Sequence, residues 1–573
     1  MPALPVAIAA LVSLWLGYRF YSRYLADKLF KLRAEEPVPA VELQDGVDFV
    51  PTNSSTLWGH HFASIAGAAP ILGPAIAIVW GWVPALVWIV FGVIFMGAAH
   101  DFGAMVLSIR HQGQSVGTLA EKFISPRSRS LFLIVIFFLI WMVGAVFAFA
   151  IAGLFVKFPA SILPVNLEIL VAIGIGWWGY RRSGSLAIPS VIALIGLYAV
   201  IFGTASGGLP VPAEDSIFRN LDFWLVSLMI YAFIASSLPV WLLLQPRDLI
   251  NSHQLIVGLS AMYIGFFVSS PTFHAPPVGD LDALPMIIPL LFVTIACGSI
   301  SGFHGLVSSG TTSKQIACAT DARSIGYGAM LCEASLAILA TMAVAAGQWS
   351  GAEHTHAFDF VMAHTDGGHS LPNVPTALGA FIHGAAGFLA ALGIPMKMGM
   401  TVVAVLVISF AATSLDTALR IQRLVIAEIG DLYRISPLKN RWVGGAIASI
   451  SVLILIYVDK EHRGKSLWPV FGATNQVLAA FTLMMCALYL RKLGRKAKAY
   501  AIPAVFVMVI TMTAMGIQVF RDLGSGKYMV GIVGGLIAIV TVWVAFEGAL
   551  AWRRTVPEGP EQSQDAQTTP PNL

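Results

Sequence analysis

The chain has 573 residues, of which 57% are hydrophobic and 11% are charged, and its formal net charge is +4. A soluble domain carries about a quarter charged residues, so this composition excludes a soluble globular protein and indicates a helical protein that crosses a membrane many times. The small positive charge lies in loops between apolar segments, where it indicates orientation and not a nucleic-acid-binding surface.

Sixteen apolar segments approach the roughly 20 residues that a membrane-spanning helix needs. In chain order they are 3–24, 58–82, 83–109, 130–156, 162–180, 185–205, 222–245, 253–271, 285–308, 326–347, 374–394, 398–419, 441–458, 467–490, 499–520 and 527–551. The first segment has neither a basic leader nor a small-residue cleavage site, so we expect it to be retained as a helix.

Lysine and arginine in short loops mark the cytoplasmic side of a membrane protein. Basic residues follow the first span, from Arg19 to Arg33. They place the N-terminus outside and predict that the first unit, 1–57, is a helix followed by an amphipathic cytoplasmic segment. The loops 272–284 and 348–373 contain no lysine or arginine, as expected of loops on the outer side.

Later basic residues fall on the cytoplasmic side only if the segment 374–394 does not cross the membrane. We therefore predict an outer-side hairpin at 348–395, about fifteen full spans and a cytoplasmic C-terminus. The last residues, 555–573, are rich in Pro, Gln and Ser and are predicted to be disordered.

The span 58–82 is interrupted near its centre by glycine and proline, which loosen a helix and remove a backbone donor. Unwound backbone at membrane depth is tolerated only where protein buries it or where it lines a wet cavity, and transporters use such breaks to bind solutes. The alternative is a packing kink. The predicted substrate-binding residues of this break are Ala66, Gly67, Ala68, Ala69 and Pro70.

The number of spans predicts an inverted repeat. Five spans lie within 58–205, and five more lie within 222–419 once the hairpin is excluded. Because five is odd, the second group is inverted relative to the first, as in the five-plus-five fold of leucine-transporter-like proteins. One helix precedes the two repeats, and about four additional helices follow at 441–551.

The first span of the second repeat, 222–245, contains a matching interruption. Ser236, Ser237 and Pro239 lie near its middle and complete the predicted substrate site. Proline and glycine are frequent in membrane helices, so the matched pair of breaks indicates more than either break alone.

Ionisable residues inside spans indicate function, and histidine titrates near neutral pH. His60 and His61 precede the first break, His100 and Asp101 lie in the next span, and His304 lies in the span 285–308 at a similar expected depth. These residues predict a proton-coupling group or an inner gate. The alternative is that each histidine is a hydrogen-bonding residue at a helix end.

Two weaker patterns extend the coupling or gate group. Ser299 and Ser301 offer hydroxyl oxygens to a sodium ion, although the small residues around them equally form a packing surface. Asp416 and Arg420 are four residues apart on one helical face, which predicts a salt bridge or a gate latch.

Six strings of residues carry a family resemblance. They are DFVPT at 48–52, GHHFASIAGAAPILGP at 59–74, LPVWLLLQPRD at 238–248, SGFHGLVSSGTTSK at 301–314, SLDTALR at 414–420 and LWPVFGATNQ at 467–476. Between about residue 40 and residue 490 the chain resembles the carbon starvation protein A (CstA) family. The resemblance implies a multi-pass transporter of the bacterial inner membrane that imports peptides, with relatives that take up pyruvate with protons.

We therefore expect a secondary active transporter that imports a small carboxylate-bearing solute, either short peptides or pyruvate, by alternating access coupled to protons or sodium. We expect a solute and the lipid bilayer as partners, no nucleic acid, no catalytic residue, no resident metal and no cofactor; the oligomeric state is not predicted. The alternatives are a channel, and a membrane enzyme with a metal site in the histidine-rich loop 348–373.

Overall fold

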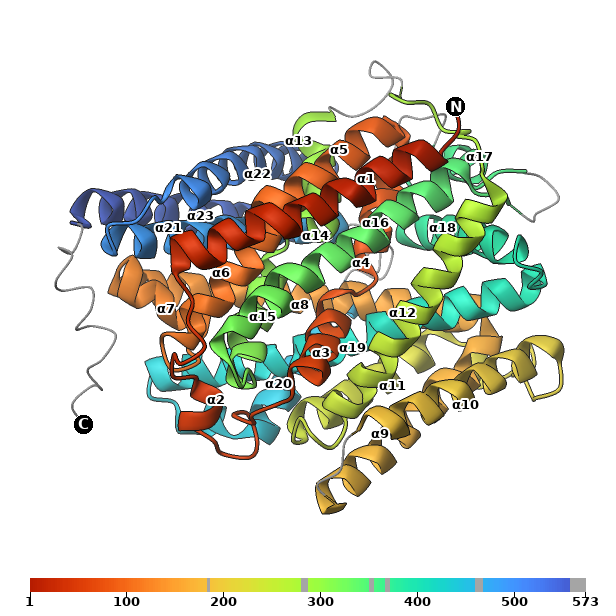
Figure 1. The fold of residues 1–573 in the computed structure, drawn as a ribbon, viewed down its shortest axis with the longest axis horizontal. Coiled ribbons are helices and arrows are strands. Elements are labelled where there is room, and N and C mark those ends of the chain that lie inside the picture. Colours follow the sequence, from red (N-terminus) through yellow and green to blue (C-terminus); the bar gives the residue numbers. More distant parts are fainter. Residues whose placement is uncertain (183–185, 280–286, 350–354, 366–370, 459–466, 557–573) are drawn as a thin grey trace.

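A computed structural model gives the fold and describes residues 1–182, 186–279, 287–349, 355–365, 371–458 and 467–556 (Figure 1). The regular secondary structure of these residues is entirely helical, and twelve of their helices are long and apolar enough to cross a membrane. The prediction of an all-α polytopic membrane protein is confirmed. Most of the predicted tail, 557–573, lies outside the described residues.

The first half of the chain contains α1 (Leu4–Leu16), α2 (Pro39–Glu42), α3 (Ser54–Ile65), α4 (Ala69–Ala77), α5 (Trp82–Gly92), α6 (Ala98–Ile109), α7 (Val116–Phe123), α8 (Pro126–Lys157), α9 (Ile162–Arg182), α10 (Ala187–Ser206), α11 (Leu221–Ser237) and α12 (Leu244–Ser269). The second half contains α13 (Ile287–Thr294), α14 (Ala296–Ser299), α15 (Gly302–Gly310), α16 (Ala329–Ala346), α17 (Ala357–Ala363), α18 (Val374–Ala390), α19 (Met396–Leu432), α20 (Arg441–Val458), α21 (Leu467–Lys492), α22 (Lys498–Gly524) and α23 (Tyr528–Arg554).

Three further apolar elements of the described chain are bent or shorter. The bent pair α3 and α4 forms one, and the shorter apolar helices α11 and α18 are the other two. With the bent pair counted as one span, the described chain has up to thirteen candidate spans, and the prediction of about fifteen remains a prediction.

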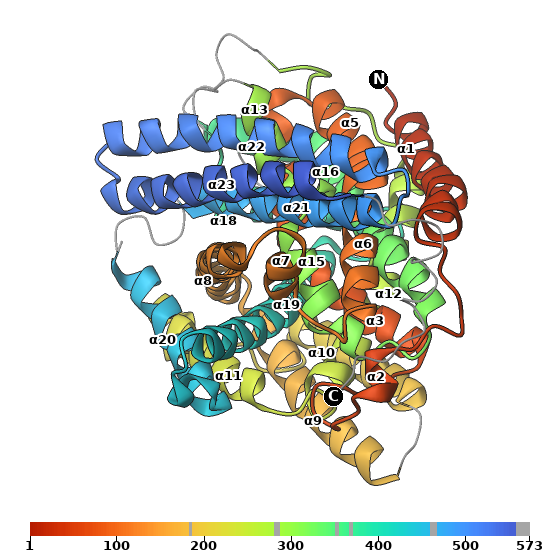
Figure 2. The same cartoon turned by 90° about the vertical axis from the view of Figure 1, so that its left-hand side faces the viewer.

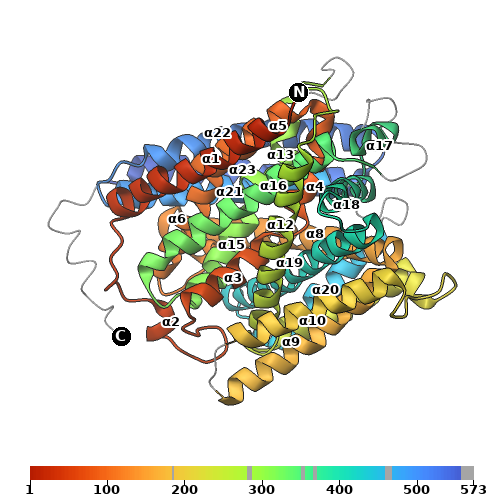
Figure 3. The same cartoon turned by 45° about the vertical axis from the view of Figure 1, so that its right-hand side comes forward.

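The two longest helices, α8 and α19, pack along each other in the middle of the molecule. Figure 2 shows α8 almost end-on, between α21 and α19. The hairpin of α9 and α10 lies along one edge of the bundle, and α1 and α22 lie along the opposite edge (Figure 3). The predicted site residues therefore lie on α19 and on helices around α8 and α19, with α9 and α10 outside them.

The predicted break in the first discontinuous helix is present. Residues 66–68 are not helical, and α4 leaves α3 at an angle of 43°. Pro70 lies in the first turn of α4, where its missing N–H removes no helical hydrogen bond. A Cβ atom on Gly67 would lie 2.6 Å from Ser414 Oγ, so the close approach of α19 requires glycine here.

A second discontinuous helix runs from 287 to 310, and its position corrects the predicted second break. Ile300 and Ser301 have extended backbone between α14 and α15. Ser236, Ser237 and Pro239 do not interrupt a span; they end α11 and begin the connection to α12. Proline is common just after a helix end because it cannot continue the helix, which explains its place at 239.

The two discontinuous helices meet backbone to backbone. A Cβ atom on Gly73 would lie 2.6 Å from the Thr294 carbonyl oxygen, and one on Gly298 would lie 3.8 Å from Pro70 Cα. Glycine at 73 thus allows α4 to approach α13 closely, whereas glycine at 298 makes room for Ala337 of α16, 2.9 Å from its Cβ position.

The segment predicted as an outer-side hairpin contains α18, which has 17 residues and is shorter than a full span. A tight turn with Gly393 at φ +83° connects α18 to α19. The helix packs against α4, α12, α16 and α19, so it is buried in the bundle and not peripheral.

Candidate functional site

Hydroxyl groups of α19 bind the backbone of α3 at the break. Thr413 Oγ1 donates to the Ala63 carbonyl at 3.3 Å, and Ser414 Oγ donates to the Ser64 carbonyl at 3.1 Å. Carbonyls at the end of a helix have lost their helical partners. These bonds replace the lost partners and hold the broken helix against α19.

A buried arginine lies beside this break. Arg247 of α12 is fully buried, and its Nη1 donates to the Asp416 carboxylate of α19 and to the Tyr231 hydroxyl at 2.5 Å. The Tyr231 hydroxyl in turn donates to Asp416 Oδ2 at 2.6 Å. Asp248, the next residue of α12, accepts a hydrogen bond from Ser64 near the end of α3, so Arg247 lies where α12 contacts α3 just before the unwound segment.

Two other donors of Arg247 form no hydrogen bond within the described chain. Neither Nε nor Nη2 has a hydrogen-bond partner among the described residues. Glu168 of α9 lies 3.7 Å from Nε, at ion-pair distance, and its other oxygen accepts from Ser409 at 2.9 Å. A buried donor without a partner is costly, and a guanidinium edge fits a carboxylate.

The acidic residue of α12, Asp248, joins this helix to α3. His60 Nδ1 lies 2.5 Å from Asp248 Oδ2, and Ser64 Oγ donates to the same oxygen at 3.4 Å. Gln315 Nε2 reaches His60 Nε2 at 3.3 Å. His60 therefore connects the first discontinuous helix to the residues that follow the second one.

A separate cluster of imidazole and carboxylate groups lies beside the second break. His100 Nδ1 lies 2.7 Å from Asp101 Oδ1, and His304 Nδ1 lies 3.1 Å from Asp101 Oδ2. Glu333 of α16 comes within 3.4 Å of the same His304 nitrogen. All four side chains are at most 1% exposed. The structure thus brings His100, Asp101 and His304 together, as expected.

The other predicted polar residues have different partners. His61 Nδ1 lies 2.8 Å from Thr312 Oγ1. Ser299 Oγ donates to the Ile295 carbonyl at 2.9 Å, and Ser301 exchanges hydrogen bonds with Asn475 of α21. The two serine hydroxyls are therefore bonded within the protein.

The predicted salt bridge between Asp416 and Arg420 is not formed. Asp416 pairs with Arg247, whereas Arg420 donates to the Asp48 carboxylate and to the Leu238 carbonyl at 2.9 Å. One helical turn separates the two residues, and different segments of the chain reach each of them. Two residues on one helical face pair only when no stronger partner approaches either.

Asp48 precedes α3. The positive charges around it lower its pKa and oppose the effect of burial. Burial alone raises the pKa of Asp48, but Arg420, Lys314 and Arg423 outweigh it and hold that pKa below its ordinary value. Asp48 is therefore a carboxylate at neutral pH, paired with a buried arginine.

Ser236 and Ser237 do not face the first break. Both hydroxyls donate to the Phe233 carbonyl of their own helix, at 3.0 and 2.9 Å. The neighbouring Leu238 carbonyl accepts from Arg420, which places this connection beside Asp48 and not beside residues 66–70.

Sequence reasoning assigned no role to four buried ionisable residues that the structure places at the two breaks, Arg247, Asp248, Glu168 and Glu333. The available signal was the presence of a charged side chain within or next to an apolar span, which marks a functional candidate by itself.

The histidine-rich loop lies partly outside the described residues. In its described part, His356 lies 3.1 Å from Asp359, and its ring stacks on His274 at 3.3 Å between centroids. Among the described residues, no group of three His, Cys, Asp or Glu side chains has the geometry to hold a metal ion.

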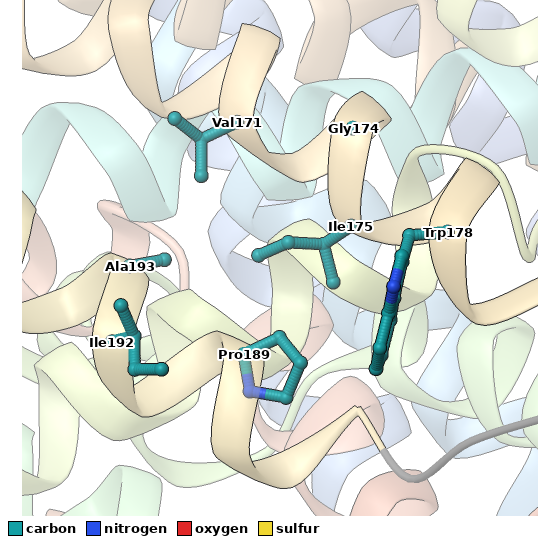
Figure 4. Close-up of a pocket in the computed structure, with 7 residues that line it drawn as sticks. All are labelled: Val171, Gly174, Ile175, Trp178, Pro189, Ile192 and Ala193. Atoms are coloured by element: carbon teal, nitrogen blue, oxygen red, sulfur yellow. The ribbon is translucent and has the colours of Figure 1, made fainter.

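An apolar groove of about 370 Å³ opens between α9 and α10 (Figure 4). Its lining residues are Val171, Gly174, Ile175, Trp178, Pro189, Ile192 and Ala193. Such a lining suits an acyl chain of a lipid and offers no counter-charge to a carboxylate.

Comparisons with known proteins agree with the resemblance noted from the sequence. The chain is 30% identical to the peptide transporter CstA of Bacillus subtilis, over 95% of this chain and 96% of that protein. It is 31% identical to the pyruvate/proton symporter BtsT of Escherichia coli, over 90% and 82%. Among solved structures, MhsT in complex with L-phenylalanine aligns with 86% of this chain and 99% of that chain, at 13% identity and a TM-score of 0.43.

The names of these relatives are those of transporters, which supports the prediction that the protein is not an enzyme. The sequence model of the carbon starvation protein CstA matches residues 2–514. The chain therefore belongs to the CstA family of multi-pass membrane proteins.

Proposed function

We propose that the protein is a secondary active transporter that imports a small carboxylate-bearing solute, either short peptides or pyruvate, across a bacterial inner membrane. The names of its relatives, peptide transporter and pyruvate/proton symporter, support both the transport role and this class of solute. The positive-inside rule supports an outer N-terminus and a cytoplasmic C-terminus.

One observation carries the choice of a carboxylate. Arg247 is fully buried beside the unwound segment, and its Nε and Nη2 donors have no hydrogen-bond partner among the described residues. Glu168 lies 3.7 Å from Nε, beyond hydrogen-bond distance, and a solute carboxylate at this edge of the guanidinium would supply the missing acceptor. The first N–H groups of α4, at the end of the unwound segment, add a positive dipole end nearby.

Helix packing supports alternating access between two inverted units. In place of the repeats predicted at 58–205 and 222–419, the first unit comprises α3–α4, α5–α6, α8, α11 and α12, and the second comprises α13–α15, α16, α19, α20 and α21. Corresponding pairs pack alike: α12 lies on α3 as α21 lies on α15, and both α11 and α20 contact α8 and α19. On this scheme the hairpin of α9 and α10 is an insertion, and rocking of one unit against the other exposes the breaks to each side in turn.

A proton or sodium gradient drives the import of the solute. Buried acids and imidazoles at both breaks support protons. The carbonyls of Ala63 and Phe410 and the hydroxyls of Thr413 and Ser414 are the hard oxygen ligands that a sodium ion would use.

Uptake by proteoliposomes tests the proposal. Pyruvate or dialanine should accumulate under an imposed gradient, whereas the corresponding amide, pyruvamide or dialanine amide, which lacks the carboxylate, should not. Arg247→Gln should weaken solute binding by about 1.5–3 kcal/mol, or roughly 10- to 100-fold. Arg129→Gln removes an arginine from a surface ion pair with Glu121 and should leave binding unchanged. Equal transport of acids and amides would contradict the proposal.

A further inference from the structure

We propose that Glu333, held against His304 and Asp101, is the proton-binding residue whose proton accompanies the solute. This assignment rests on the proposed function, and it concerns the cluster at the second break, away from Arg247. Neither the sequence patterns nor the relatives' names assign a role to Glu333.

The Glu333 carboxyl group forms no hydrogen bond in the described structure, although His304 lies near it. Glu333 is fully buried, and neither of its carboxylate oxygens has a hydrogen-bond partner among the described residues. No lysine or arginine of the described chain pairs with Glu333 or Asp101. Because an isolated buried carboxylate is very costly, Glu333 carries a proton in this conformation.

The single His304 Nδ1 cannot serve both acids. It lies 3.1 Å from Asp101 Oδ2, 3.2 Å from Met330 Sδ and 3.4 Å from Glu333 Oε2. One nitrogen donates one hydrogen at a time, and Asp101 is the nearer acid. Asp101 also has His100 at 2.7 Å, so Glu333 is the acid left without a donor.

Other titratable groups also face the cluster. His61 of α3 and Cys297 of α14 face it. The Tyr500 hydroxyl of α22 donates to the Ala99 carbonyl at 2.9 Å, next to His100. These neighbours add no fixed positive charge, so a proton is what neutralises Glu333.

The cluster connects α15 and α16, two helices that must move relative to each other during transport. His304 is the third residue of α15, directly after the extended residues Ile300 and Ser301, whereas Glu333 belongs to α16, which packs on α3 and α4. A change of angle at the second break therefore moves His304 relative to Glu333 and opens the carboxyl group to water. The proton on the Glu333 oxygen then leaves to water on that side, and the carboxylate takes up a proton from the opposite side in the other conformation.

The Glu333→Gln variant tests this assignment, because glutamine imitates the protonated acid and cannot release a proton. In proteoliposomes it should still exchange labelled for unlabelled solute without a gradient. Accumulation driven by a pH gradient should fall by roughly tenfold or more. Glu121→Gln, at a surface ion pair, is the matched control and should accumulate solute as the wild type does. Gradient-driven accumulation by Glu333→Gln at the wild-type level would overturn the assignment.

A second variant covers the case in which Glu333→Gln does not fold. His304→Gln keeps the acid but removes the imidazole beside it, and it should shift the pH dependence of exchange by about one unit. An unchanged pH profile would overturn the assignment. If accumulation by the wild type depends on a sodium gradient and not on a pH gradient, the proton site alone is overturned. If the wild type transports neither pyruvate nor dialanine, the proposed function is overturned.

Discussion

Arg247 and Asp416 form a fully buried ion pair between α12 and α19, 169 residues apart in sequence. The pair lies beside the break in the first discontinuous helix and connects the two inverted units proposed above. Tyr231 bonds to both partners, so the network holds three helices together at one point.

Removing one partner of this pair should be costly. In Asp416→Asn, Arg247 loses its closest anion, and breaking a buried pair typically costs about 3–5 kcal/mol. Asp431→Asn is the control, because its pair with Lys439 is half-exposed and such pairs contribute about 0–1 kcal/mol. Thermal unfolding of the purified proteins in detergent measures both. Equal melting temperatures for the two variants would show that the buried pair is not structural.

The break at Gly67 should tolerate no side chain. A Cβ atom there would lie 2.6 Å from Ser414 Oγ and 3.2 Å from Phe147, so Gly67→Leu should displace α19 from α3. We expect membrane insertion without solute uptake. Gly516→Leu in α22 is the control, because nothing lies within 4 Å of its Cβ position. Normal uptake by Gly67→Leu would contradict a solute site built from the unwound backbone.

The Asp48 to Arg420 pair gives a prediction for acid stability. Because the neighbouring arginines and lysine hold the pKa of Asp48 below its ordinary value, the stabilisation is complete above the unfolded pKa of about 3.9. It is lost as the pH falls through the lower folded value. Stability measured from pH 7 to pH 3 should therefore drop more steeply for the wild type than for Asp48→Asn. Parallel curves would show that the pair contributes nothing.

The sequence predicted the fold and the first break because both have strong local signals. Apolar segments show the spans directly, and Gly67 and Pro70 within such a segment indicate a break. The second break at Ile300 and Ser301 has no proline, and its small residues equally indicate close packing. Pro239, the stronger local signal, only follows the end of a helix.

Partners distant in sequence could not be predicted. Asp416 has Arg420 one turn away on the same helix, which made a local pair the natural expectation. The actual partner, Arg247, is chosen by how α12 packs against α19, and that packing depends on the whole fold. Glu333 is similar, because a lone acid in an apolar span indicates importance but not which imidazole it meets.

The Tyr231 hydroxyl should stabilise the folded protein, because it lies between the charges of Arg247 and Asp416. Tyr231→Phe removes the 2.6 Å hydrogen bond to Asp416 and the acceptor that Arg247 uses at 2.5 Å. Hydrogen bonds to charged groups contribute about 1.5–3 kcal/mol, so the free energy of unfolding should fall by that amount. Tyr198→Phe is a matched control, because the Tyr198 hydroxyl is buried without a hydrogen-bond partner in the described chain and its loss should be neutral or stabilising. Denaturant unfolding followed by tryptophan fluorescence distinguishes the two variants. A Tyr231→Phe protein as stable as Tyr198→Phe would show that Arg247 and Asp416 hold their geometry without the phenol.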